Sequence, residues 1–163
     1  MQVLVDADAC PVVVKEMLYR AAQRVEVCVT LVANKYLRTP PSRFIKALQV
    51  PAGFDAADDR IVELASSGDL VITADIPLAA AAIDKGAYVL DPRGIWFSPE
   101  NIQERLTMRE VMEQLRSSGI DTGGPAPYAA QDGKAFAGQL DRFLARKALR
   151  GAAGSSVPSP GTQ

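Results

Sequence analysis

The sequence predicts an α/β fold with three layers, in which a doubly wound and mainly parallel sheet of five strands lies between two layers of helices. Two observations support this prediction. Short apolar segments alternate along the chain with amphipathic segments. The apolar segments lack the polar–apolar alternation of strands with one face in water, so each suits a strand buried on both faces. Because parallel strands are joined by right-handed crossovers, we expect the order 3-2-1-4-5.

The first fifty residues contain three of the expected strands and one helix. Val3–Val5 is a short apolar run, typical of a central strand. The helix Pro11–Arg24 begins with a proline, whose missing N–H costs nothing in a first turn. Val25–Ala33 is rich in β-branched residues and predicts a second strand. A stiff loop with Pro40-Pro41 separates it from a shorter strand over Phe44–Val50.

The middle of the chain contains two further helix–strand pairs. Ala56–Ser66 is predicted to be a helix, and Gly68 just beyond it suits a helix end. Leu70–Thr73 is a continuous apolar strand. The alanine-rich segment Pro77–Lys85 predicts the next helix, and Ala87–Leu90 predicts the fifth strand.

The last third of the chain is expected to add helices to this sheet. Ser98-Pro99-Glu100 has the pattern of an N-cap, a first-turn proline and a first-turn acid, and predicts a helix running to Ser117. A loop rich in glycine and proline precedes a last helix over Gln131–Arg150. We therefore expect a single domain over residues 1–150, a helical extension over 96–149 and a disordered tail over 151–163.

The composition excludes several classes of function. The chain has no histidine, which excludes Ser-His-Asp triads, Cys-His pairs and histidine-ligated metal sites. Two cysteines are too few for a disulfide framework or a four-cysteine zinc site. The net charge is −1, so a nucleic-acid-binding surface would have to be a local patch. No apolar run is long enough to span a membrane. We expect a cytoplasmic protein whose oligomeric state the sequence does not determine.

Aspartates follow the ends of several predicted strands. Asp6 and Asp8 follow the first strand, and Asp75 follows the fourth, its expected neighbour. Because the carboxyl ends of parallel strands meet at one edge, these carboxylates are expected to converge. Carboxylates packed together raise each other's pKa unless a cation neutralises them, and oxygen-only ligands favour Mg²⁺ or Mn²⁺. The expected ligands of one or two such ions are Asp6, Asp8, Asp58, Asp59, Asp75 and Asp91.

Each of these aspartates also has an ordinary structural alternative, which for Asp6 is a solvated side chain. Asp8, Asp58, Asp59 and Asp75 all lie near a predicted helix start, where an aspartate caps the first turn. Asp91 precedes a proline and can shape a turn.

Basic and aromatic residues follow the second strand and could complement the acidic edge. Such residues form a track for a phosphate backbone with stacking aromatic rings, whereas the alternative is an ordinary solvated loop. The residues of this expected RNA-binding patch are Lys35, Tyr36, Arg38, Arg43 and Lys46, together with Arg93 after the fifth strand.

Seven motifs in the chain carry a resemblance to a known family. In order, they are VDADACP, LVAN, QVPAGFDAAD, DLVITADIPLA, DPRG, RSSGIDTGGP and QLDRFLAR. Together they resemble the YaiI/YqxD family of bacterial proteins, from Val3 to about Leu149. That family is similar to the PIN-like (NYN-related) superfamily, whose known enzymes are metal-dependent ribonucleases with an aspartate cluster on a Rossmann-like sheet.

The resemblance implies roles for particular residues. Asp6, Asp75 and either Asp58 or Asp59 would match the metal-site positions of the PIN-like superfamily, with Asp8 and Asp91 as supplementary acids. In a nuclease, Asp6 and Asp75 would hold the main ion, and Asp58 or Asp59 a second ion or water. The region Trp96–Leu149 extends beyond a minimal PIN-like core.

Two other functions compete with the nuclease. A haloacid-dehalogenase-like phosphatase would use Asp6 as nucleophile and Asp8 as general acid. However, Cys10-Pro11 stands where that family has threonine or serine, and the segment Ile61–Thr73 lacks its expected lysine. The other alternative is a non-catalytic PIN-like module that binds RNA or a protein.

Overall fold

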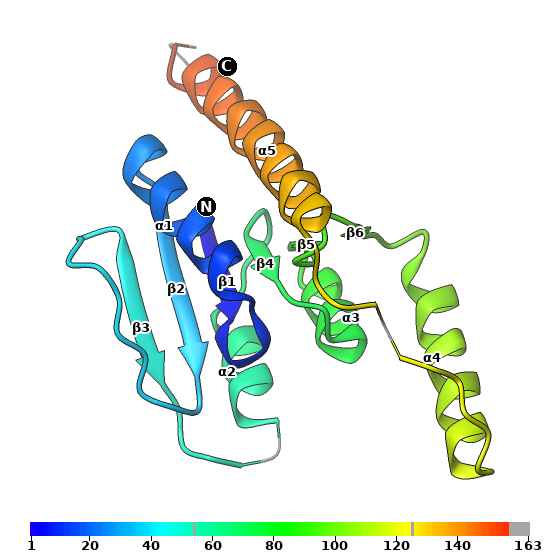
Figure 1. The fold of residues 1–163 in the computed structure, drawn as a ribbon. Helices are drawn as coiled ribbons and strands as arrows, with labels where there is room; N and C mark the ends of the chain where they lie inside the picture. Colours follow the sequence, from blue (N-terminus) through cyan, green and yellow to red (C-terminus); the bar gives the residue numbers. More distant parts are fainter. Residues whose placement is uncertain (54, 125, 157–163) are drawn as a thin grey trace.

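The computed structural model describes residues 1–53, 55–124 and 126–156, with side chains described as far as residue 150 (Figure 1). Its sheet has six strands in the order β3-β2-β1-β4-β5-β6. Neighbouring strands from β3 to β5 are parallel, which confirms the predicted α/β class and the order of the first five strands. The strands are β1 (Gln2–Asp6), β2 (Cys28–Ala33), β3 (Ile45–Gln49), β4 (Leu70–Ile72), β5 (Tyr88–Leu90) and β6 (Trp96–Phe97).

In the described residues, five α-helices surround this sheet, and a 3₁₀ turn, Ala7–Ala9, follows β1. The helices are α1 (Val12–Val25), α2 (Ala56–Leu64), α3 (Ile76–Asp84), α4 (Ile102–Ser117) and α5 (Ala130–Ser156). None of the described helices combines the length and apolar character needed to cross a membrane.

The side chains of β1 divide between the two faces of the sheet, as a strand's period of two requires. Val3 and Val5 pack into a core with α1 and α5, whereas Leu4 packs into a second core with α2 and α3. All three residues are fully buried, which agrees with the prediction of a central strand. The three predicted layers therefore exist, with one hydrophobic core on each face.

The sixth strand was not predicted. Trp96–Phe97 runs antiparallel to β5 because the chain reverses in a tight turn after Leu90. In that turn the N–H of Asp91 donates to the carbonyl of Ile95, and Gly94 has φ +86°. A two-residue strand has no periodicity to read, and it exists only because the edge of β5 is there to pair with.

Helices α4 and α5 differ from their predicted ends. Helix α4 begins at Ile102 rather than directly after Ser98, because Ser98 and Asn101 close a turn ahead of it. The hydroxyl of Ser98 accepts from the N–H of Asn101, and the N–H of Ser98 donates to the side chain of Asn101. Helix α5 extends to Ser156, beyond the predicted end at Arg150. The disordered tail was predicted over residues 151–163; the helix continues through 151–156, and residues 157–163 lie outside the described residues.

Candidate functional site at the carboxyl edge of the sheet

Asp6 and Asp75 are connected through the hydroxyl of Thr73. Because Val5 pairs with Ile72 in the sheet, the residues that follow each strand are neighbours. Thr73 donates to Oδ2 of Asp6 at 2.9 Å, and its hydroxyl accepts from the N–H of Asp75 at 3.0 Å. The side chain of Thr73 is buried. It therefore fixes how the ends of β1 and β4 lie relative to one another.

Asp75 caps the first turn of α3, which is the ordinary structural role expected for it as an alternative to metal binding. Its Oδ1 accepts from the N–H of Leu78 at 2.9 Å. Among the described residues, Oδ2 of Asp75 and Oδ1 of Asp6 accept no hydrogen bond. A carboxylate has two oxygens, so capping leaves one of them for another partner.

Asp58 lies close enough to these two carboxylates to feel their charge. It stands in the first turn of α2, which begins on the same edge of the sheet. Its pKa is raised to about 6, first by partial burial and then by the negative charges of Asp75, Asp6, Asp55 and Asp59. Three carboxylates from three elements thus repel one another here, which is the condition that a bound cation relieves.

The pKa of Asp6 is raised in the same way. Burial is the largest cause, and the charges of Asp75 and Asp8 add to it, whereas the hydrogen bond from Thr73 lowers the pKa. Asp8 itself is exposed, and its Oδ2 accepts from the N–H of Asn34 at 2.7 Å. This bond ties the turn after β1 to the end of β2. Asp8 thus contributes its charge at the margin of the cluster.

The carboxylates come close without converging on one point. In the part of the chain that the structure describes, no three acidic or thiol side chains are near enough to hold a metal ion together. The donor chemistry fits Mg²⁺ or Mn²⁺, because the available ligands are oxygens and the pKa values of Asp6 and Asp58 are raised by burial and neighbouring negative charge. One further oxygen suits this chemistry, since Oδ1 of Asn34 is buried and has no hydrogen-bond partner among the described residues. The ligand atoms therefore suit Mg²⁺ or Mn²⁺, whereas the carboxylates lie farther apart than the ligands of one bound ion.

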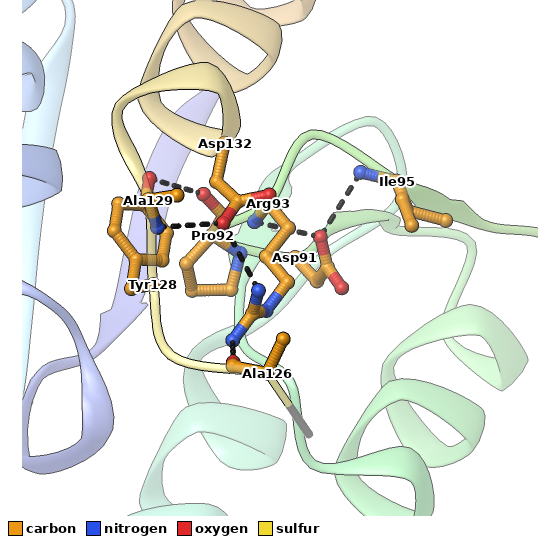
Figure 2. A network of polar contacts seen from close by, with 8 residues as sticks. All are labelled: Asp91, Pro92, Arg93, Ile95, Ala126, Tyr128, Ala129 and Asp132. Atoms are coloured by element: carbon orange, nitrogen blue, oxygen red, sulfur yellow. Dashed lines mark hydrogen bonds and ion pairs between the residues drawn. The ribbon is translucent and has the colours of Figure 1, made fainter.

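Asp59 and Asp91 stand apart from this cluster. Asp59 is exposed on α2 and contributes only its charge to the raised pKa of Asp58. Asp91 is buried, and its Oδ1 accepts from the N–H of Arg93 at 2.9 Å and from that of Ile95 at 3.0 Å (Figure 2). Asp91 therefore shapes the turn between β5 and β6, the ordinary role that the sequence offered for it beside metal binding.

Arg93 fastens the start of α5 to this turn (Figure 2). Its Nη1 lies 3.0 Å from Oδ2 of Asp132, and its Nη2 donates to the carbonyl of Ala126. The guanidinium also lies over the ring of Tyr128, whose hydroxyl donates to the carbonyl of Pro92. Arg93 therefore has a structural role that its position after a strand did not reveal.

The predicted basic patch is divided by the course of its loop. Lys35 and Tyr36 follow β2 and remain near the acidic edge, where Tyr36 is 80 % exposed. With Asp8 and Lys15 they line a cavity of about 230 Å³. The loop then runs back along the edge of the sheet, since β3 is parallel to β2. Arg43 precedes β3 and Lys46 is its second residue, so both lie toward the opposite end. Arg38 is exposed within the loop.

Two residues of this edge were missed by sequence reasoning. The sequence predicts Thr73 as the last residue of a strand. Its hydroxyl directly after the apolar run Leu70–Ile72 was the one indication that it could contact the neighbouring aspartates. Lys15 lies within the predicted helix Pro11–Arg24, and only the fold shows that it lines the cavity beside Asp8. Cys10 is buried nearby, and burial raises its pKa to about 12, so the thiol stays neutral and unreactive.

A family model described as "Uncharacterized BCR, YaiI/YqxD family" matches residues 4–146. The chain belongs to the YaiI/YqxD family. Its similar proteins include a UPF0178 protein of Cupriavidus pinatubonensis, 92 % identical over 90 % of this chain and 97 % of the relative. A UPF0178 protein of Burkholderia cenocepacia is 77 % identical over 92 % of this chain and all of the relative. No solved structure significantly matches the chain.

The match to the YaiI/YqxD family confirms the resemblance stated from the motifs. It also extends over β6, α4 and most of α5. The helices beyond the fifth strand are therefore part of the YaiI/YqxD domain, and the turn built by Asp91 and Arg93 is the place where α5 joins it.

Proposed function

We propose that this YaiI/YqxD protein is a cytoplasmic, Mg²⁺- or Mn²⁺-dependent nuclease that hydrolyses phosphodiester bonds in RNA. The observation that carries the proposal is the group of carboxylates from β1, α2 and α3, in which burial and neighbouring negative charges raise the pKa values of Asp6 and Asp58. The cost of holding these charges together is explained if the group's partner is a divalent cation. The location supports the same conclusion, since open α/β sheets bind ligands at the carboxyl ends of neighbouring central strands.

Asp6 and Asp75 would hold the ion through the oxygens that accept no hydrogen bond from the described residues. Thr73 orients both, because its hydroxyl contacts the carboxylate of one and the backbone of the other. Asp58 would bind water or a second ion. A bound divalent cation would supply charge neutralisation at the scissile phosphate and activation of a water molecule.

The cavity beside Asp8 supports RNA as the substrate. Lys15 and Lys35 would bind phosphates of the backbone, and the exposed ring of Tyr36 would stack on a base. Both cysteines of the chain are free, which suits the reducing conditions of the cytoplasm.

A non-catalytic RNA-binding module is the second candidate. It is favoured by the spacing of the acids, since no three of them in the described residues meet at coordination distance. In such a module the same lysines and Tyr36 would bind RNA, and the aspartates would serve to cap helices and join strands.

The test is Mn²⁺ binding by calorimetry together with cleavage of a labelled single-stranded RNA. The variants are Asp6→Asn with Asp75→Asn, and the matched control is Asp84→Asn, an exposed residue at the other end of α3. We expect binding and cleavage by the wild type and the control, and neither by the double variant. Absence of Mn²⁺ binding by the wild type would contradict the metal site.

Binding of Mn²⁺ without RNA cleavage would favour the binding module. A parallel assay with a small phosphate ester covers the phosphatase alternative. Hydrolysis of that ester that is lost in both Asp6→Asn and Asp8→Asn, with no RNA cleavage, would replace the nuclease by the phosphatase.

A further inference from the structure

A second cavity lies at the opposite end of the sheet. It has a volume of about 620 Å³, within the range of sites that bind small molecules. Tyr88, the first residue of β5, lines it, whereas the acidic cluster follows the carboxyl ends of the strands. Figure 1 shows β5 and β6 beside α5, the elements that supply most of its walls. The cavity is therefore separate from the acidic site.

Three aromatic rings, those of Tyr88, Trp96 and Phe143, pack together in the wall of this cavity. The ring of Phe143 is buried and contacts Tyr88 edge-on, with centroids 5.3 Å apart, and Trp96 at 5.6 Å. The indole N–H of Trp96 donates to the side chain of Gln139 at 3.0 Å, which fixes the orientation of the ring. Tyr88 is 43 % exposed. The cavity thus offers a pre-oriented aromatic surface to a flat ligand.

Three cations stand on the same side of the cavity. Arg146, Lys147 and Arg150 line it from α5, and Glu100 is the one acidic side chain among its described lining residues. The ammonium of Lys147 lies 5.0 Å from the ring centroid of Tyr88 and 5.6 Å from that of Phe143. None of the three cations forms an ion pair with an acid in the described part of the chain.

We propose that this cavity binds a nucleotide unit. Its base would lie against Tyr88 and Trp96, and its phosphate would be held by Arg146 and Lys147. Charge favours an anion, because three cations face one carboxylate, and the aromatic surface favours an anion that carries a flat ring. A free nucleoside monophosphate and a nucleotide within single-stranded RNA share this chemistry. The proposal does not depend on the acidic site.

The single tryptophan of the chain is a built-in reporter, since Trp96 lines the cavity. We would titrate adenosine monophosphate and a short oligoadenylate against the intrinsic fluorescence of the full chain, without divalent ions. The variant is Arg146→Ala with Lys147→Ala. The control is Arg142→Ala, an exposed cation on the same helix outside the cavity.

We expect a saturable change in fluorescence for the wild type and for Arg142→Ala. Loss of two charged contacts should weaken binding about 10-fold or more in the double variant, whose thermal melting shows whether it is folded. Binding of the monophosphate indicates a free nucleotide as ligand, and binding of the oligoadenylate alone indicates an RNA segment. Asp6→Asn with Asp75→Asn should bind equally well, which separates this proposal from the nuclease.

Three results would overturn the proposal. One is the absence of a saturable response to both ligands. Another is equal weakening in the control and in the double variant, since the cations of the cavity would then have no special part. The third is equal affinity for inorganic phosphate or for an oligoglutamate, because the aromatic surface would then contribute nothing to recognition.

Discussion

The two ends of the sheet hold opposite charges. In the described residues, neither the aspartates at one end nor the cations at the other form an ion pair. At the carboxyl edge, Asp6, Asp58 and Asp75 repel one another, and the pKa of Asp58 rises to about 6. At the opposite end, Lys147 lies over the rings of Tyr88 and Phe143 and Arg146 lines the same cavity, and neither cation has an acidic ion-pair partner among the described residues. Like charges held together repel one another, and the two proposals explain this arrangement by a bound cation at one end and a bound anion at the other.

The largest effect expected is the loss of metal-dependent activity at the carboxyl edge alone. In Asp6→Asn with Asp75→Asn, RNA cleavage should fall by at least about 100-fold, because the proposed ligands of the ion are neutral. Nucleotide binding in the cavity lined by Tyr88 and Trp96, measured by the fluorescence of Trp96, should stay unchanged. If both ends lost function together, they could not be independent sites.

Asp91 sharpens the comparison, because it ends a strand at the same edge but is bound into a turn. Asp91→Ala leaves the N–H groups of Arg93 and Ile95 without their acceptor and should lower the free energy of unfolding by about 2–3 kcal/mol. Urea denaturation measures this loss. Mn²⁺ affinity at a temperature where the variant is folded should match the wild type, and a large drop would return Asp91 to the set of metal ligands.

Thr73 should affect both stability and the metal site. Thr73→Val removes a donor to Asp6 and an acceptor for the N–H of Asp75, and should cost about 1–2 kcal/mol of unfolding free energy. Because it orients the proposed ligands, Mn²⁺ affinity should also fall by about 10-fold or more. Thr73→Ser keeps the hydroxyl and is the control. Unchanged affinity in Thr73→Val would show that orientation by this hydroxyl is unimportant.

The smallest effect expected is a pH-dependent gain in stability. The folded-state pKa of Asp58 is raised from 3.8 to about 6, so the ionised carboxylate destabilises the fold as pH rises through this window. Asp58→Asn should therefore raise the melting temperature of the metal-free protein at pH 7.5 and leave it unchanged at pH 3.5. Asp58 is largely solvated, so the gain should be about 1 kcal/mol.

The control for this prediction is Asp59→Asn, an exposed neighbour on the same helix. Saturating Mn²⁺ should reduce the difference between the wild type and Asp58→Asn, because the cation removes the repulsion. A lower melting temperature for Asp58→Asn at pH 7.5 would mean that its carboxylate makes a stabilising contact instead.

Within the acidic edge, sequence reasoning located the residues but not their individual roles. Asp6, Asp75 and Asp91 all follow apolar strands, and strand order placed them on one edge. Their hydrogen bonds then separate them, since Asp75 caps a helix, Asp91 holds a turn and Asp6 bonds to Thr73. The pattern of a strand followed by aspartate is the same in all three cases, so it could not distinguish them.

The three-layer α/β fold and the order of its first five strands follow from the amino-acid sequence alone, because apolar runs and helix-start residues are properties of consecutive positions. Which charged side chains form hydrogen bonds or ion pairs depends instead on tertiary contacts. The bond between Asp6 and Thr73 joins residues 67 positions apart, and that between Arg93 and Asp132 joins residues 39 apart. Such pairs form only when separate elements meet, and local patterns contain no record of them.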